Sequence, residues 1–141
     1  MGDDGHGASV DSVYGFRLGD GPEVFALDVP AYVGRRPTAP RIPARTGPRL
    51  VRVASPHQEV SATHLEVRQL GASVIVTDLR TTNGSVVMLP GSVPRKLRQG
   101  ESVVVSPGTL VDIGDDNIVH IVPVAPSPGS VPLTKESGRQ P

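Results

Sequence analysis

The 141-residue sequence contains no cysteine and no tryptophan, and only four of its residues are aromatic. Without cysteine the chain can form no disulfide, no thiolate zinc site and no thiol nucleophile. Its longest apolar runs extend over a few residues, and Asp3 and Asp4 lie where a secretory signal would need positive charge. The sequence therefore predicts neither a membrane span nor export, and we expect a cytoplasmic location.

A net charge is also absent, because 14 basic residues balance 14 acidic ones. This balance gives no general attraction to nucleic acid or to a membrane surface. The charges are unevenly distributed, however: the first 28 residues carry six acids and one arginine, whereas six arginines lie between residues 35 and 52. A basic region on a neutral protein favours a small, local anionic ligand.

Valine is abundant, with 22 residues against nine alanines, and β-branched side chains suit strands better than helices. The 16 glycines and 15 prolines indicate many turns. Short apolar segments recur at intervals of about 8–12 residues, without any helical periodicity. The sequence therefore predicts an all-β fold, a two-sheet β-sandwich of roughly ten or eleven short, mainly antiparallel strands.

We expect one domain over residues 11–123, between a flexible tail at residues 1–10 and a disordered, Pro- and Ser-rich tail at residues 124–141. Prolines between residues 37 and 48 rule out regular structure there and leave a long, Arg-rich loop. The predicted strands cover residues 12–18, 23–29, 31–34, 49–54, a segment that begins at 65, and then 73–79, 85–89, 93–97, 101–106, 109–113 and 117–122.

One polar stretch lies between two valine-rich runs and contains the dipeptide Asn83-Gly84. Both residue types tolerate the positive φ of a tight turn, so the dipeptide predicts a hairpin that joins strands 73–79 and 85–89. Apolar residues occupy both faces of residues 73–79, which predicts a central strand.

Loops at one end of a β-sandwich commonly carry its function, and three loops here hold groups suited to an anion. Arg35 offers a planar, charged fork that matches phosphate oxygens. Ser61 offers a hydroxyl and a backbone N–H, both able to donate to phosphate. Asn83 can donate to and accept from the backbone of an extended peptide. Together these groups predict a phosphopeptide-binding site.

The three motifs, in this order, resemble those of the forkhead-associated (FHA) domain, a phosphothreonine-binding β-sandwich. Its pattern is Gly-Arg at a strand end, then Ser-x-x-His, then an Asn-Gly turn. Here these are Gly34-Arg35, residues 61–64 and Asn83-Gly84, and Asp78-Leu79 and Thr82 also match. The resemblance extends over residues 12–123, which is most of the chain.

This resemblance implies that Arg35 and Ser61 hold the phosphate, that Thr82 helps to line a pocket for the threonine methyl group, and that Asn83 binds the ligand backbone. It also implies that the imidazole of His64 ties the loops together. Structural roles are implied for Gly34, His64 and Gly84.

Two departures from the family pattern concern the ligand contacts. The position after Ser61 is often Arg or Asn in the family, but it is Ala62 here, which removes one polar contact. Arg36 is a candidate to replace that contact, and Thr63 is a further accessory candidate. The segment between Gly34-Arg35 and Ser61 is also longer and richer in proline and arginine than is usual.

We therefore expect a binding module, not an enzyme, that recognises phosphothreonine in a partner protein and acts in Ser/Thr-kinase-dependent signalling or assembly. The expected partner is a phosphothreonine-containing protein, with no cofactor, no metal, no nucleic acid and no membrane. The alternative is a β-sandwich for phosphate-independent protein interaction or oligomerisation.

Other function classes are less consistent with the sequence. A hydrolase built from Ser61, His64 and Asp78 would lack a Gly-x-Ser-x-Gly elbow and a suitable nucleophile–base spacing. The histidines lack the paired spacing of a metal site. The four aromatic residues all precede the Arg-rich loop, so they form no stacking platform for nucleic acid there.

Overall fold

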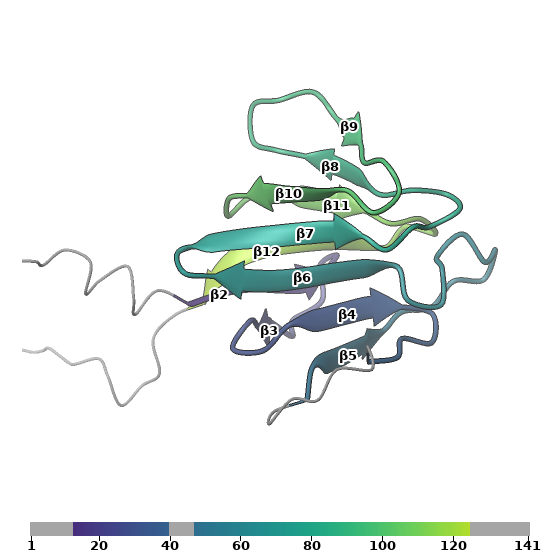
Figure 1. Ribbon diagram of the computed structural model, residues 1–141, viewed down its shortest axis with the longest axis horizontal. Coiled ribbons are helices and arrows are strands. Elements are labelled where there is room, and N and C mark those ends of the chain that lie inside the picture. The colour runs from purple at the N-terminus through teal and green to yellow at the C-terminus, as the bar shows by residue number, and fades with distance from the viewer. Residues whose placement is uncertain (1–12, 40–46, 125–141) are drawn as a thin grey trace, which may run out of the picture.

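A computed structural model describes residues 13–39 and 47–124, and Figure 1 shows their arrangement. Within these ranges the chain forms eleven strands in two sheets that face each other, which confirms the predicted all-β sandwich. This part of the chain forms no helix long and apolar enough to cross a membrane. The tail predicted at residues 1–10 lies outside the described residues, as does all of the tail predicted at residues 124–141 except Val124, which belongs to a strand.

The first sheet has five strands in the order β10-β7-β6-β4-β5. Its neighbouring strands are antiparallel except for β4 and β5, which run parallel. Parallel neighbours require a long connection, and the Arg-rich segment between these two strands supplies it. The strands are β4 (Ala31–Gly34), β5 (Arg49–Arg52), β6 (Leu65–Leu70), β7 (Ser73–Asp78) and β10 (Ser102–Val105).

The second sheet has six strands in the order β3-β2-β12-β11-β8-β9, and all its pairs are antiparallel. The predicted strand 23–29 shrinks to two residues, because only these pair with β2. Conversely, β12 continues to Val124, beyond the predicted strand end at 122, because it pairs along β2 to Val13. The strands are β2 (Val13–Leu18), β3 (Phe25–Ala26), β8 (Val86–Met88), β9 (Arg95–Lys96), β11 (Leu110–Asp112) and β12 (Ile118–Val124).

The core between the sheets is aliphatic and rich in valine. In β7 burial alternates from residue to residue, so that Val74 and Val76 face the core. As predicted, β7 is an interior strand, because it pairs with β6 on one side and with β10 on the other. Phe16 adds the largest fully buried side chain and stacks on Phe25 with ring centroids 5.2 Å apart.

The predicted hairpin at Asn83-Gly84 is wrong. The strand before the dipeptide, β7, belongs to the five-stranded sheet, whereas the strand after it, β8, pairs with β9 and β11 in the other sheet. Both edges of β7 are already hydrogen-bonded to β6 and β10, so β8 has no free edge to pair with. Residues 79–85 therefore cross from one sheet to the other, with Gly84 at a φ of 87°.

A buried carboxylate at the end of β7 organises this crossing loop. Asp78 is fully buried and accepts hydrogen bonds from Thr81 N at 3.1 Å, Thr81 Oγ1 at 2.7 Å and Ser85 Oγ at 2.6 Å. Thr81 Oγ1 in turn accepts from Gly84 N at 2.9 Å. A carboxylate can remain in a core only when donors surround it, and here those donors all come from the loop.

Replacing Asp78 by Ala should leave three loop donors without their acceptor in a buried place. We expect the free energy of unfolding to fall by about 3 kcal/mol, because each unsatisfied buried donor costs its desolvation. Urea unfolding at neutral pH measures the change. The matched control is Asp28→Ala, which removes a carboxylate that is 66% exposed and pairs with Arg49 at 3.0 Å. The control should change stability by less than about 1 kcal/mol, and equal effects of both variants would contradict the role of the network.

Candidate functional site

Three loops converge at one end of the sandwich, opposite the end where the described chain begins and ends (Figure 1). The first loop follows β4, the second connects β5 to β6, and the third connects β7 to β8. Hydrogen bonds join the first two loops, since Arg35 N donates to Ser61 O at 3.1 Å and Arg36 N donates to Ala62 O at 3.0 Å. The third loop joins them through Asn83 Nδ2, which donates to Glu59 O at 3.0 Å. The structure thus brings the three predicted motifs together.

Gly34 allows the first two loops to approach each other. A Cβ atom at this position would lie 2.1 Å from the carbonyl oxygen of Ala62, and backbone atoms cannot retreat as a flexible side chain would. Only glycine therefore fits between β4 and the Ser61 loop, and it sets the distance from Arg35 to that loop.

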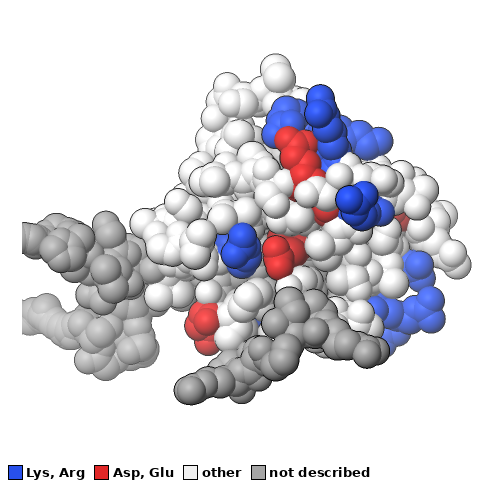
Figure 2. Space-filling model, viewed as in Figure 1, with Lys and Arg blue, Asp and Glu red and all other residues white. Residues whose placement is uncertain are grey.

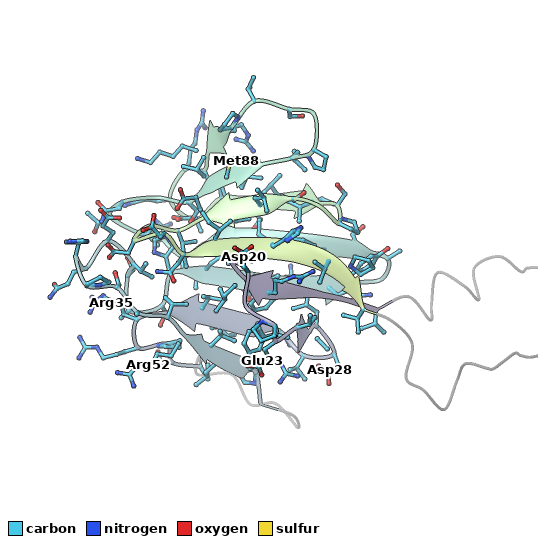
Figure 3. The ribbon with its side chains drawn as sticks, turned by 180° about the vertical axis from the view of Figure 1, so that it is seen from behind. Asp20, Glu23, Asp28, Arg35, Arg52 and Met88 are labelled. Atoms are coloured by element: carbon cyan, nitrogen blue, oxygen red, sulfur yellow. The ribbon has the colours of Figure 1, made fainter. Side chains whose placement is uncertain are left out.

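Arg35 provides a positive charge beside the Ser61 loop. Its Nε donates to the carbonyl of Val60, which fixes the side chain, and its backbone carbonyl accepts from Arg52 Nε at 3.1 Å. Among the described residues, none of the ion pairs involves Arg35. Figure 3 shows Arg35 and Arg52 at the same end of the molecule. The terminal nitrogens of Arg35 can therefore hold an anion with two parallel hydrogen bonds.

Positive side chains are concentrated on this side of the molecule. In the face shown by Figure 2, most of the lysines and arginines lie toward the right, where the loops lie, or above β7 near β9.

Ser61 offers an anion one donor group, whereas the sequence suggested two. Its backbone N–H donates to His64 Nδ1 at 3.0 Å, so the predicted donation of this N–H to a phosphate does not hold. Its hydroxyl has no hydrogen-bond partner in the described part of the chain, and the residue is half-buried. The hydroxyl is the group of Ser61 that is available to an anion.

His64 is fully buried and connects two loops. Nδ1 accepts from Ser61 N, so Nε2 carries the proton and donates to the carbonyl of Gly84 at 2.9 Å. The bond from Ser61 N requires the neutral imidazole, because a protonated Nδ1 cannot accept. Burial lowers the pKa of His64, and this effect outweighs the opposite influence of the Gly84 carbonyl and of Asp78.

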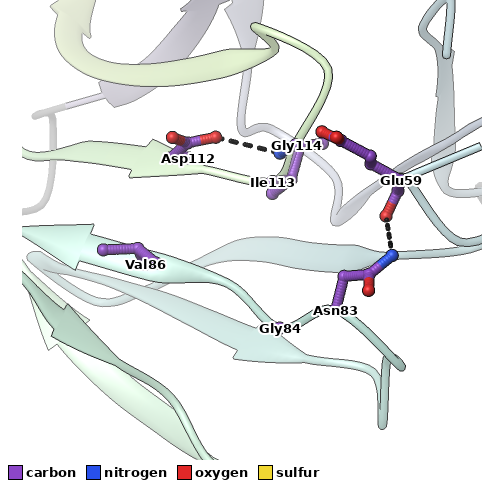
Figure 4. A pocket seen from close by; sticks show the side chains of 7 residues that line it. All are labelled: Glu59, Asn83, Gly84, Val86, Asp112, Ile113 and Gly114. Carbon is purple, nitrogen blue, oxygen red and sulfur yellow. Dashed lines mark hydrogen bonds between the residues drawn. The ribbon is translucent and has the colours of Figure 1, made fainter. Parts of the chain in front are cut away.

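Asn83 and Gly84 line a pocket of about 290 Å³, which Figure 4 shows from close by. The amide of Asn83 uses Nδ2 for the Glu59 carbonyl, and its oxygen can accept from the backbone of a ligand. Thr82 is exposed beside this pocket but does not line it. The full lining is Glu59, Asn83, Gly84, Val86, Asp112, Ile113 and Gly114.

The accessory candidates lie beside the site. Arg36 and Ala62 are both exposed, and their backbones are hydrogen-bonded to each other. Thr63 Oγ1 accepts from Thr38 N at 3.2 Å, so this hydroxyl supports the Arg-rich loop. Of the three, Arg36 carries the side chain best suited to an additional phosphate contact.

A fourth loop, residues 113–117 between β11 and β12, supports the site and was not predicted. The side chain of Asp115 is 2% exposed and accepts from Ser55 Oγ, from His57 N at 3.2 Å and from Glu59 N at 3.1 Å. It also contacts His57 Nδ1 at 2.9 Å. Although desolvation opposes ionisation, these hydrogen bonds lower the pKa of Asp115 to about 2.

Through Asp115 the fourth loop fixes Glu59, whose carbonyl holds Asn83. Asn117 Nδ2 adds a bond to Ala54 O at 2.8 Å. The sequence predicts a turn at Gly114-Asp115, between strands 109–113 and 117–122, but it gives no sign that this turn would meet a loop more than fifty residues earlier.

Comparisons with known proteins agree with this geometry. The family model of the FHA domain matches residues 32–114, which is more than half of the chain. The chain therefore belongs to the FHA-domain family. No curated protein sequence matches it significantly.

Solved structures show the same fold. The FHA domain of the CT664 protein from Chlamydia trachomatis is 20% identical, with a TM-score of 0.56 over 81% of this chain and 100% of that one. The FHA domain of human APLF, solved in complex with an XRCC1 bisphospho peptide, is 16% identical, with a TM-score of 0.56 over 78% and 97%. A domain described in a study of phosphothreonine-dependent FHA interactions is 22% identical, with a TM-score of 0.52 over 82% and 98%.

The burial of neutral His64 predicts a pH dependence of stability. Because the pKa of His64 is lower in the folded state, its contribution is complete above the unfolded pKa of about 6.5 and is lost as the pH falls below that value. His57 acts in the opposite direction, because the Asp115 carboxylate raises its pKa. His57→Gln removes this opposite contribution. The effect of His64 is therefore measured by comparing His57→Gln with the double variant His57→Gln/His64→Gln.

Urea unfolding between pH 5 and pH 8 should show that the single variant loses stability as the pH falls. The double variant should be less stable at pH 7 by about 1–3 kcal/mol, because one hydrogen-bond partner is lost at each loop. The stability of the double variant should also depend less on pH than that of the single variant. Identical pH profiles for the two variants would show that His64 does not titrate with folding.

The contacts of the Asp115 carboxylate lead us to expect that it holds the loop before Ser61 in place. Asp115→Asn replaces one acceptor oxygen by a donor, so the backbone N–H groups of His57 and Glu59 should exchange with solvent severalfold faster. Amide hydrogen exchange measures this change. Asp116→Asn is the matched control. Asp115 and Asp116 both have a positive φ, of 49° and 63°, but the side chain of Asp116 is exposed. If exchange rises equally in both variants, the loop does not depend on the Asp115 contacts.

Proposed function

We propose that this domain binds phosphothreonine in a partner protein, with Arg35 and Ser61 on the phosphate and Asn83 on the backbone of the bound segment. The observation that carries the proposal is the position of Arg35. Its guanidinium is anchored by the Val60 carbonyl, is not neutralised by a carboxylate of the described residues, and lies in the loop hydrogen-bonded to Ser61.

The arrangement suits a phosphate better than a carboxylate ligand. Arg35 can supply two parallel donors and the Ser61 hydroxyl a third, which matches the several oxygens of a phosphate group. Arg36 follows Arg35 in the chain, Arg52 Nε donates to the Arg35 carbonyl, and both arginines are exposed. The site is preorganised by hydrogen bonds among the loops, so little conformational entropy is lost when a ligand binds.

Asn83 supports recognition of the peptide as well as of its phosphate. The Glu59 carbonyl holds its side-chain amide in one orientation, with the amide oxygen left as an acceptor for a ligand N–H. Thr82, exposed beside it, is proposed to contact the threonine methyl group, although it does not line the neighbouring pocket. Gly34, His64 and Gly84 act only through the loops that they hold.

The domain acts by binding and not by catalysis, as is general for its family. We infer that the interaction serves signalling or assembly that depends on a Ser/Thr kinase, since such an enzyme must create the ligand. The cytoplasmic location of this interaction, and the domain limits of residues 11–123, stay predictions.

Phosphothreonine binding can be tested with a degenerate phosphothreonine peptide library and the unphosphorylated and phosphoserine versions of the selected peptide. Arg35→Ala and Ser61→Ala should each lower affinity at least about tenfold, which corresponds to about 1.4 kcal/mol. Arg35→Lys should also bind more weakly, because an ammonium group cannot form the paired hydrogen bonds. Isothermal titration calorimetry measures the affinities, and urea unfolding checks that each variant is folded.

Arg68→Ala is the control, because Arg68 lies on β6 outside the loops and pairs with Glu66 at 3.6 Å. It should bind the phosphopeptide as the unmodified domain does. Full affinity in both Arg35→Ala and Ser61→Ala would refute the site. Binding that survives phosphatase treatment of the partner would instead favour the alternative, a phosphate-independent interaction or oligomerisation module.

A further inference from the structure

Two hollows open on the outer face of the six-stranded sheet. The first is the pocket beside Asn83, and the second has a volume of about 400 Å³. The second hollow lies between the end of β2, the first residue of β11 and the start of β12. Its lining is Gly19, Asp20, Leu110, Asp116, Ile118 and His120.

The strand register shows that both hollows open on one face. Asp112 lines the first hollow and Ile118 lines the second, and these two residues are direct partners in the β11–β12 pair. Side chains of directly opposed residues in an antiparallel pair point to the same side of the sheet. Val86, which also lines the first hollow, is the partner of Asp112 on the other side. In Figure 3, Asp20 lies over this same face.

The two hollows form one acidic surface with an apolar floor. Glu59 and Asp112 border the first hollow, Asp20 and Asp116 border the second, and no lysine or arginine lines either one. Two basic residues lie at the margins of this surface. Lys96 is directly opposite Val86 in the β8–β9 pair, and its side chain lies against Gly84. Arg17 on β2 is directly opposite His120 on β12. The apolar floor consists of the half-buried Val86, Leu110 and Ile118, whereas Ile113 borders the first hollow but belongs to the buried core.

The carboxylates are only partly used by the protein itself. Glu59 Oε1 accepts from Asp115 N at 2.6 Å, and Asp112 Oδ1 accepts from Gly114 N at 2.9 Å, so each keeps a second oxygen for a ligand. Asp20 and Asp116 are exposed. A chain with both cationic and apolar side chains would complement this surface.

The geometry points to an extended peptide interface: the partner segment that flanks the phosphothreonine continues from Asn83 over both hollows. Its lysine or arginine side chains face the four carboxylates, and its apolar side chains cover the floor at Leu110 and Ile118. This inference rests on the proposed function. The connection is that Asn83, which would hold the ligand backbone, itself lines the first hollow.

Three synthetic phosphothreonine peptides with the same central sequence test the interface. One has no flanks, one has flanks of about ten residues, long enough to cross a sheet, with alternating lysine and leucine, and one has glutamate in place of each lysine. By fluorescence polarisation at low salt, the lysine peptide should bind roughly fivefold or more tighter than the glutamate peptide. The unphosphorylated lysine peptide measures non-specific binding.

The double variant Asp20→Asn/Asp116→Asn should lose most of this preference while it binds the short peptide normally. Asparagine keeps the shape of both side chains and tolerates the positive φ of Asp116. Glu23→Gln is the control, because it removes an exposed carboxylate that lines neither hollow, and it should keep the preference.

The two possible failures can be distinguished. If Arg35→Ala binds the short peptide with full affinity, the proposed function fails. If Arg35→Ala weakens the short peptide but the flanks make no difference, or the double variant keeps the lysine preference, only the extended interface is overturned.

Discussion

The arrangement of the site depends on one buried imidazole. The two nitrogens of His64 point in opposite directions, and one accepts from Ser61 N while the other donates to the Gly84 carbonyl. The ring therefore connects the loop before β6 to the loop that crosses between the sheets. Because the ring is fully buried, its hydrogen bonds do not compete with water. The relative position of the Ser61 hydroxyl and the Asn83 amide follows from this one side chain.

Two buried carboxylates extend this support to either side. Asp78 holds the crossing loop by hydrogen bonds from Thr81 and Ser85. Asp115 accepts from Glu59 N, and the Glu59 carbonyl in turn orients the Asn83 amide. The Ser61 loop and the Asn83 amide are thus held by polar groups that do not contact the phosphate. Such networks rigidify a loop when all their members are paired, and a rigid site loses little entropy on binding.

The family match covers fewer residues than the folded sandwich does. The match covers residues 32–114, so it contains every motif of the phosphate site but excludes β2, β3 and β12. The excluded strands complete the six-stranded sheet, and β12 supplies Ile118 and His120 to its outer face. The motifs of the phosphate site all lie within the matched residues, whereas the proposed extension also uses residues outside the match, among them Asp20, Asp116 and Ile118.

The sequence by itself determined the fold class and the candidate residues. Apolar residues on both faces of residues 73–79 predicted the interior strand β7, and the ordered motifs at Arg35, Ser61 and Asn83 indicated the loops that the structure brings together. Only the tertiary structure decided that Asn83-Gly84 crosses between sheets and that Asp115 supports the Ser61 loop. The physical reason is that side-chain periodicity shows which face of a strand is buried, but not which strand pairs with it or which distant donor reaches a carboxylate.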